Sequence, residues 1–169
     1  MGGAGAHWRA RAARVAVVVG GGTVAVVLLQ LWSYAHADNP ALIERSVIVR
    51  TATSHCAAMR DAASAAAVGT SASIVQRVGA INAQNDAVTE MVSTIRRLVP
   101  ADQLSADRPA DEWLDDWGRL VRERDAYARA LAAGKPTPLV LPVVDGRGLV
   151  SRLDDVGLNC RVPRVMLAP

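Results

Sequence analysis

The chain has 169 residues and a net charge of +3. Three arginines near the N-terminus, Arg9, Arg11 and Arg14, account for that charge, because the residues from Asp38 onward carry sixteen basic and sixteen acidic side chains. A balanced charge without a basic stripe excludes a nucleic-acid-binding surface, so we expect no nucleic-acid partner. The length allows one small domain beside a membrane anchor.

Residues 15–32 read VAVVVGGGTVAVVLLQLW and contain no charged side chain. A helix rises about 1.5 Å per residue, so this stretch is about 27 Å long, close to the thickness of a bilayer's hydrocarbon core. We predict a single-pass transmembrane anchor over residues 15–34 and a cytoplasmic tail over residues 1–14, because arginines gather on the cytoplasmic side. The main domain would then lie outside the cytoplasm.

A cleaved signal peptide is the alternative interpretation of this segment. The sequence Ala35-His36-Ala37 fits a cleavage site, and the arginines fit the charged start of such a peptide. The apolar core of a signal peptide is about 7–15 residues long, which is shorter than the stretch found here. A retained anchor is therefore favoured, and both interpretations export the same domain.

Small residues recur four positions apart within the predicted span. Ala16 and Gly20 form one such pair, and Gly21 and Ala25 form another. This spacing lets two helix backbones approach closely inside a membrane. We interpret it as a face that packs against a partner span, although a composition rich in glycine and alanine would also produce it.

Residues 38–134 are predicted to form an extracytoplasmic bundle of about three helices. The first covers 41–68, with Asn39-Pro40 at its start and Gly69 after its end. Residues 46–51 have strand propensity, but the periodic sequence that follows them favours a helix. One face of this helix carries mostly small side chains, which are Val49, Ala52, Cys56, Met59, Ala63 and Ala66.

The second helix has the clearest pattern and runs from a cap at Ser71 or Ser73 to Pro100. Apolar residues and one asparagine repeat at spacings of four and three, at Ile74, Val78, Ile81, Asn85, Val88, Val92, Ile95 and Val99. A lone Asn85 in such a seam is typical of a coiled-coil homodimer. Packing inside one chain is the favoured interpretation, because Met91 and Leu98 broaden the apolar face.

A polar connector over 101–108 is expected to lead to a third helix, with Pro109 in its first turn and Gly134 as its C-cap. Its seam consists of Trp113, Trp117, Leu120, Arg124, Tyr127 and Leu131. The aromatic residues of this seam could form a binding face. They are more simply explained as bulky core side chains beside the alanine-rich helix.

Residues 135–169 are predicted to form a short hairpin or an irregular tail. A turn at 145–148 separates the apolar runs 139–144 and 149–150, and Pro142 limits the first run to an edge strand. We expect the residues from 163 onward to fray. The neighbouring carboxylates Asp115-Asp116 and Asp154-Asp155 are expected to face solvent or to act as helix-start charges, and not to form an acid/base pair.

Cys56 and Cys160 both follow the predicted span, in an oxidising compartment where disulfides persist. Two cysteines allow one intramolecular pairing, so we predict a bridge that closes a loop of about 100 residues and attaches the tail to the first outer helix. Two unpaired cysteines are the alternative. Without further cysteine or histidine ligands nearby, the pair does not predict a metal site.

One set of residues in the outer domain resembles a family of small single-pass envelope proteins of actinobacteria. The set comprises Trp113, Trp117, Arg122, Arg124, Asp125, Tyr127, Gly134, Asp145, Gly146, Arg152, Leu153, Asp154, Asp155, Asn159 and Cys160. The likeness covers roughly residues 50–163. It implies one N-terminal span, paired outer cysteines and no catalytic residues.

The residues do not assemble a catalytic pattern. His7, His36 and His55 are far apart in the sequence, and His55 is badly placed to activate Cys56 because adjacent helical residues point about 100° apart. We therefore predict no catalytic, cofactor-binding or metal site and a non-enzymatic protein.

The expected function is that of an accessory or scaffold subunit in a cell-envelope complex. Its partners would be the lipid bilayer and a membrane protein or further copies of the chain. One alternative is a lipid- or ligand-binding module with an apolar pocket lined by Met59, Trp113 and Trp117. The other is a self-associating coiled coil.

Overall fold

The computed structural model describes residues 24, 26–28, 42–135 and 137–167. Residues 1–39 and 40–169 form two compact units, and the account below concerns the second. The predicted anchor lies outside the described residues, apart from 24 and 26–28, which are helical. Within the described part of the chain, no helix is both long enough and apolar enough to cross a membrane. The anchor, its small-residue pairs and the cleavage site therefore stay predictions.

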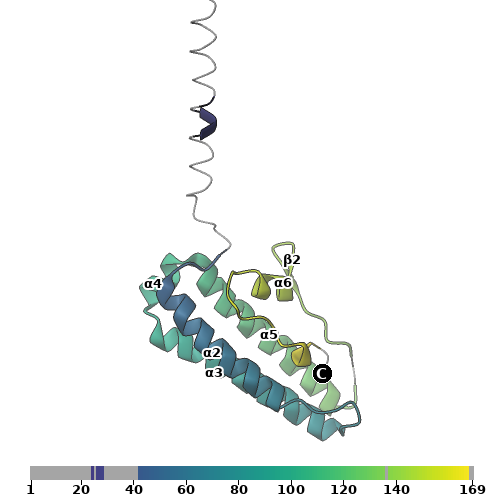
Figure 1. Ribbon diagram of the computed structural model, residues 1–169. Helices are drawn as coiled ribbons and strands as arrows, with labels where there is room; N and C mark the ends of the chain where they lie inside the picture. Colours follow the sequence, from purple (N-terminus) through teal and green to yellow (C-terminus); the bar gives the residue numbers. More distant parts are fainter. Residues whose placement is uncertain (1–23, 25, 29–41, 136, 168–169) are drawn as a thin grey trace, which may run out of the picture. The chain divides into compact units, whose positions relative to one another are not determined.

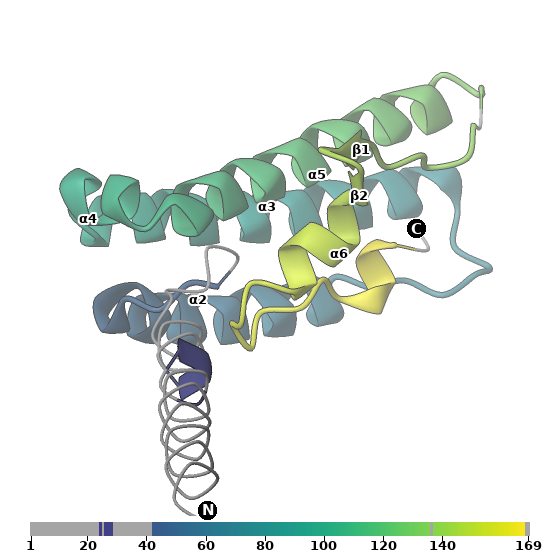
Figure 2. The ribbon, with the colours of Figure 1, turned by 90° about the horizontal axis from the view of Figure 1, so that it is seen from above.

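The described residues from 42 onward are mainly helical, as predicted. The long helices are α2 (Ser46–Ala65), α3 (Ile74–Leu98) and α5 (Arg108–Ala132). Helix α3 is the central one and packs against both α2 and α5 (Figure 1). The C-terminal residues lie across the opening between α2 and α5 (Figure 2).

Helix α2 begins later than predicted, at Ser46 and not at residue 41. The preceding residues are held by other parts of the chain, because the Ile43 N–H donates to the Val156 carbonyl (3.0 Å). The Asp107 carboxylate accepts from the backbone N–H groups of Glu44 (3.3 Å) and Arg45 (3.2 Å). A carboxylate distant in sequence thus supplies acceptors at this helix start, which a local capping pattern cannot reveal.

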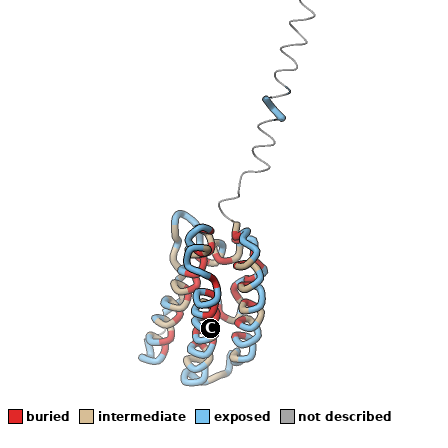
Figure 3. The backbone as a smooth tube through the Cα atoms, turned by 90° about the vertical axis from the view of Figure 1, so that its left-hand side faces the viewer, coloured by how far each residue is buried: buried red, intermediate tan, exposed pale blue. Residues whose placement is uncertain are grey.

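The small-residue face of α2 is buried, and α2 packs against α3. Figure 3 shows that the buried segments of the long helices lie on the inner side of the bundle. The fully buried residues of α2 are Ile48, Ala52, Cys56, Met59 and Ala63, while Val49 and Ala66 are half-buried. Residues 46–51 are helical, as predicted. The helix ends at Ala65, so Gly69 lies in the following loop and does not terminate it.

Helix α3 starts at the predicted cap, because the Ser73 and Gln76 side chains form a reciprocal capping box. Met91 is buried as expected, but Leu98 is 56% exposed and does not extend the apolar face. The expected connector over 101–108 contains a short helix, α4 (Ala101–Ala106). Pro100 begins it and Leu104 anchors it in the core, so this part of the prediction was wrong.

Helix α5 ends in a glycine motif at the predicted place. Gly134 has φ +68°. Its N–H donates to the Leu131 carbonyl (3.1 Å), and the Lys135 N–H donates to the Ala130 carbonyl (2.9 Å). This pair of bonds defines a Schellman motif, which satisfies carbonyls at the end of the helix.

The predicted hairpin exists, but its second strand was misplaced. Strand β1 (Val143–Val144) pairs with β2 (Arg147–Gly148) around a two-residue turn, Asp145-Gly146. Both turn residues have positive φ, as the tight turns that match strand twist require. The expected strand at 149–150 is instead the start of helix α6 (Leu149–Asp154).

The tail contributes much more to the core than expected. After α6, the buried residues Val156, Leu158, Cys160 and Val162 alternate with exposed ones. This period of two is typical of an extended segment with one buried face. A short 3₁₀ helix, η1 (Arg164–Met166), follows and buries Met166 completely, so the expectation of fraying from 163 was wrong for these residues.

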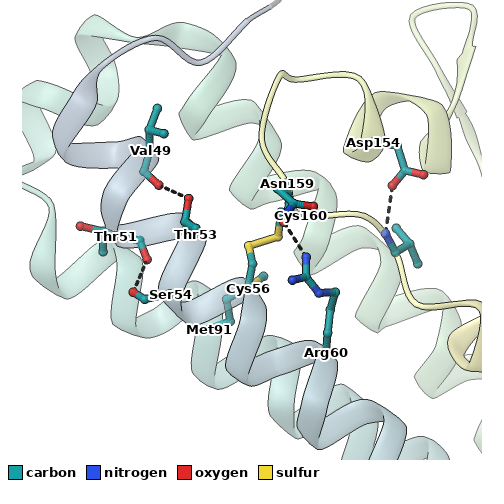
Figure 4. The surroundings of a disulfide bond; sticks show 11 residues. Val49, Thr51, Thr53, Ser54, Cys56, Arg60, Met91, Asp154, Asn159 and Cys160 are labelled. Atoms are coloured by element: carbon teal, nitrogen blue, oxygen red, sulfur yellow. Dashed lines mark hydrogen bonds between the residues drawn. A yellow bond between two sulfur atoms is a disulfide. The ribbon is translucent and has the colours of Figure 1, made fainter.

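A disulfide joins Cys56 of α2 to Cys160 of the tail, and this prediction is confirmed. The two Cα atoms are 5.4 Å apart, and both residues are at most 1% exposed. Beside the bridge, the Arg60 guanidinium donates to the Asn159 carbonyl (Figure 4). One covalent and one polar contact thus attach the same stretch of tail to α2.

Replacing both cysteines by alanine in the full chain should lower the free energy of unfolding. The bridge spans 104 residues, for which loop-closure entropy gives at most about 4–5 kcal/mol. Chemical denaturation in a neutral detergent measures the loss. The single substitution Thr53→Ala, on the exposed face of the same helix, serves as a control and should change stability by less than about 1 kcal/mol. An unchanged midpoint for the cysteine-free chain would contradict the stabilising role.

Candidate functional site

The centre of α5 places a fully buried arginine in the core. Arg124 is 0% exposed and its guanidinium donates to three oxygens. Nε donates to Asn85 Oδ1 (2.8 Å), Nη2 to the Gln84 side-chain oxygen, and Nη1 to the Met166 carbonyl. One side chain therefore joins α5 to α3 and to the C-terminal η1.

The two amides of α3 continue this network. Asn85 is 3% exposed, and its Nδ2 donates to Asp125 Oδ1 (2.6 Å). Gln84 Nε2 donates to the Ala63 carbonyl of α2 (3.3 Å). The polar member of the α3 seam thus bonds to α5 of its own chain.

The charge of Arg124 is only partly compensated. Its three acceptors are neutral oxygens, and the Asp125 carboxylate is linked to it through Asn85. Burial lowers the pKa of Arg124 from its ordinary value to about 10, while the negative charge of Asp125 opposes that shift. The guanidinium therefore remains cationic at neutral pH in a region of low dielectric.

A pocket of about 330 Å³ adjoins this network at the turn between α2 and α3. It lies at the end of α2 opposite residue 42, and its lining includes Gln84. The other lining residues are Ala67, Val68, Gly69, Thr70, Arg77, Ala80, Ile81 and Val165. None of these is acidic. The volume is at the lower end of the range for small-molecule sites.

Arg77 supplies the cationic group of the pocket wall. It lies in the first turns of α3, and its Nη2 donates to the Tyr127 hydroxyl of α5 (3.2 Å). Tyr127 was predicted as a core residue and is half-buried. It packs against the buried residues Ile81, Ala128 and Leu131, and its hydroxyl accepts the hydrogen bond from Arg77.

A second charge cluster, centred on the buried Asp116, attaches α6 and the hairpin to α5. The Arg152 guanidinium contacts Asp116 (2.7 Å), Asp145 (3.1 Å) and Glu112 (3.6 Å). The hydrogen bond to Asp116 is the largest cause that raises the pKa of Arg152. The Asp116 side chain is 3% exposed, so the expectation that it faces solvent was wrong. Asp115 does lie at the surface, where it pairs with Arg96.

The predicted aromatic seam is part of the core. The Trp113 and Trp117 rings meet edge to face, with centroids 6.3 Å apart. Both residues and Met59 are at most 2% exposed, and none of them lines the pocket described above. Among the described residues, neither indole N–H has a hydrogen-bond partner. The pocket described above is thus lined by other side chains than those of the apolar pocket suggested by the sequence.

The structure brings together some predicted site residues and adds others. Asn85 contacts Arg124 directly, Trp113 contacts Trp117, and the cysteines are bonded. The sequence interpretation did not include Gln84 or Arg77, and it named Asp116, Asp125 and Arg152 without assigning them these contacts. The sequence does contain a signal for the buried network, because Asn85 interrupts the apolar seam of α3 and Arg124 interrupts that of α5. The predicted membrane-packing residues Ala16, Gly20, Gly21 and Ala25 lie outside the described residues.

Comparison with family models, curated proteins and solved structures finds no match. In the part of the chain that the structure describes, no group of three His, Cys, Asp or Glu side chains could hold a metal ion. The site must therefore be interpreted from its own geometry.

Replacing Arg124 by methionine should destabilise the fold by about 2–4 kcal/mol. The change leaves the oxygens of Gln84, Asn85 and Met166 buried without their donor. The exposed Arg122 of the same helix is the matched control, and Arg122→Met should cost less than about 0.5 kcal/mol. Denaturant unfolding of the two full-length variants measures both losses of stability. Equal unfolding midpoints for Arg124→Met and Arg122→Met would contradict the role of Arg124 in the buried network.

Replacing Asn85 by valine should leave the molecular mass in solution unchanged, because the seam is buried inside the chain. The variant should also lose about 2–3 kcal/mol of stability, since Arg124 and Asp125 each lose a partner. Sedimentation of the full chain in a neutral detergent, beside a denaturation curve, measures both. A fall in mass would mean that Asn85 contacts a second copy.

Proposed function

We propose that the chain is a non-enzymatic, membrane-anchored accessory or scaffold subunit of a cell-envelope protein complex. Its outer bundle faces the extracytoplasmic side. The proposal combines an uncharged segment at 15–32, preceded by arginines, with an outer domain of balanced charge. Its resemblance to small single-pass envelope proteins of actinobacteria points the same way.

The disulfide is the single observation that carries the proposal most strongly. Cys56 and Cys160 are bonded and buried, and such bridges are formed and kept in oxidising compartments. In the sequence, Cys56 follows the end of the apolar segment at Trp32 by 24 residues. An exported domain tethered close to the bilayer explains both features together.

A second candidate function is a ligand-binding module. It is favoured by the pocket beside Arg77 and Gln84, which combines a cation, an amide and apolar groups in one wall. Small-ligand sites typically have this composition. The two functions are compatible, because an accessory subunit can carry a ligand site.

A copurification experiment tests the scaffold proposal. An N-terminal tag leaves the buried C-terminal tail intact, and extraction of native membranes in a mild neutral detergent should recover one or more membrane proteins at a fixed ratio. Gly20→Val/Gly21→Val tests whether the span mediates the contact, with Val18→Leu as the matched control. A clean monomer from native membranes would contradict the proposal.

Thiol labelling tests the location independently. In intact cells, Cys56 and Cys160 should stay unlabelled by a maleimide until a reductant is added and the protein is unfolded. The purified protein should also retain its N-terminal segment. Thiols that react freely without a reductant, or a mature chain that begins at Asp38, would contradict the tethered, exported domain.

A further inference from the structure

The segment between α5 and the hairpin has an extended backbone with polar groups that the fold does not pair. Residues 137–142 contain no helix, turn or bend. They run from the end of α5 back to β1, at the outer edge of the domain in Figure 1. Within the described part of the chain, the N–H groups and carbonyls of Thr137, Leu139 and Leu141 form no hydrogen bond with other backbone groups. Water must satisfy them, because unpaired backbone groups are costly to bury.

Pro138 and Pro142 share one edge of this segment. In the hairpin, Val144 is next to the turn, so its N–H and carbonyl point to β2. Backbone groups of successive residues in an extended chain point to opposite edges, so those of the two prolines lie on the edge of Val144. The Pro142 carbonyl agrees with this, because it accepts from the Leu149 N–H (3.1 Å). The missing proline N–H groups are thus on the hairpin side.

The opposite edge keeps all its donors. It consists of the backbone groups of Thr137, Leu139, Leu141 and Val143, each with one N–H and one carbonyl. The side chains over residues 137–143 carry no charge, and those of Val140 and Val143 belong to residues that are 73% and 70% exposed. Such a row of unpaired donors and acceptors is a template for a further strand.

The segment is complementary to itself in one register. When two copies run antiparallel with Val140 at the two-fold axis, Leu139 of one copy lies opposite Leu141 of the other, and each N–H meets a carbonyl. Pro138 and Pro142 are equally far from Val140 in the sequence, so they face each other at positions that need no donor on this edge. No donor that the pairing requires is missing.

The charges at the two ends of the segment favour the same arrangement. Lys135 precedes Val140 by as many residues as Asp145 follows it, so the register brings the lysine of one copy to the aspartate of the other. Lys135 is exposed, and the Asp145 side chain is 80% exposed although it also contacts Arg152. Opposite charges that face each other stabilise antiparallel pairs. A second copy therefore supplies a complementary charge at both ends.

We propose that residues 137–143 of two copies pair as antiparallel β-strands around Val140 and join the two hairpins into one sheet. This inference rests on the proposed scaffold function and deepens it, because it names a second copy as a partner. Two strands of this length bury less area than a standard stable interface. We therefore expect the contact to be weak in dilute detergent and favoured where the membrane confines both chains.

Cysteine cross-linking in native membranes tests the pairing. In the proposed register, the two copies of residue 140 form a pair whose Cα atoms are about 4.5 Å apart, within the range that a disulfide spans. Val140→Cys in the full chain should therefore give a disulfide-linked dimer on mild oxidation. A non-reducing gel detects the dimer, and mass spectrometry assigns the new bridge. The native bridge between Cys56 and Cys160 is buried and should stay intact.

Two other variants with one added cysteine are the matched controls. Thr137→Cys lies in the same segment, but the register offsets the two new cysteines by six residues, which is about 20 Å along the strands. Val75→Cys lies on α3, where the valine is 81% exposed and outside the segment. Both variants should give at least about tenfold less dimer than Val140→Cys, because distant cysteines cannot be bridged.

A proline variant tests the backbone hydrogen bonds. Leu139→Pro removes one N–H donor from each copy, so it should lower the dimer yield of the Val140→Cys chain at least about fivefold. Leu139→Ala shortens the same side chain and keeps the N–H, so it should keep the dimer. Circular dichroism should show the same helix content in both variants.

The outcomes separate clearly. A Val140→Cys dimer that is lost with Leu139→Pro and kept with Leu139→Ala supports the proposal. Absence of this dimer from oxidised membranes overturns it, as does equal cross-linking of Thr137→Cys. A linked species that contains a different protein overturns the second copy as the partner. None of these results changes which other membrane proteins copurify, so a failure of the scaffold proposal is distinguishable.

Discussion

The buried guanidinium of Arg124 is the interaction on which the arrangement of the bundle depends. It bonds to two amides of α3 and to a backbone carbonyl of η1, while its own backbone belongs to α5. A cation without a directly bonded carboxylate is costly to bury, so each of its acceptors must be in place. The position of the tail is therefore linked electrostatically to the packing of α3 on α5.

The tail is held by two different kinds of contact. The disulfide fixes Cys160 to α2, and η1 lies farther along, with Met166 over Arg124. Between them, Val162 is buried and its N–H donates to the Asp154 carboxylate (2.9 Å). A covalent bond thus brings the tail close, and directional hydrogen bonds set its position. This segment, through Val165, also forms one wall of the pocket.

Much of the helical bundle could be predicted from local sequence. The seams of α3 and α5, the cap at Ser73 and the end at Gly134 follow from periodicity and from the chemistry of helix termini. The disulfide followed from the number of cysteines and the expected compartment. The helix features depend on residues that are close in sequence. The disulfide could be predicted because two cysteines allow only one intramolecular pairing.

The errors arose where distant residues decide the structure. The start of α2 depends on Asp107, and the burial of Asp116 depends on Arg152. Neither pair can be predicted from the spacing of neighbouring residues, because the partners are far apart in the sequence. In the tail, the alternation of apolar residues from Val156 to Val162 is a local signal of an extended segment with one buried face. The pocket could not be predicted, because its wall combines a loop, one face of α3 and a residue of η1.

The attachment at the start of α2 determines how the domain would respond to mechanical tension. A pull on the chain ahead of residue 42 first loads the Ile43–Val156 hydrogen bond and the Asp107 contacts. On the N-terminal side, unravelling would then release residues 42–55, about 50 Å of extended chain, before Cys56 is reached. Beyond that point force would pass through the sulfur–sulfur bond to Cys160. The helices between the two cysteines would thus be shielded from a load applied at the two ends of the domain.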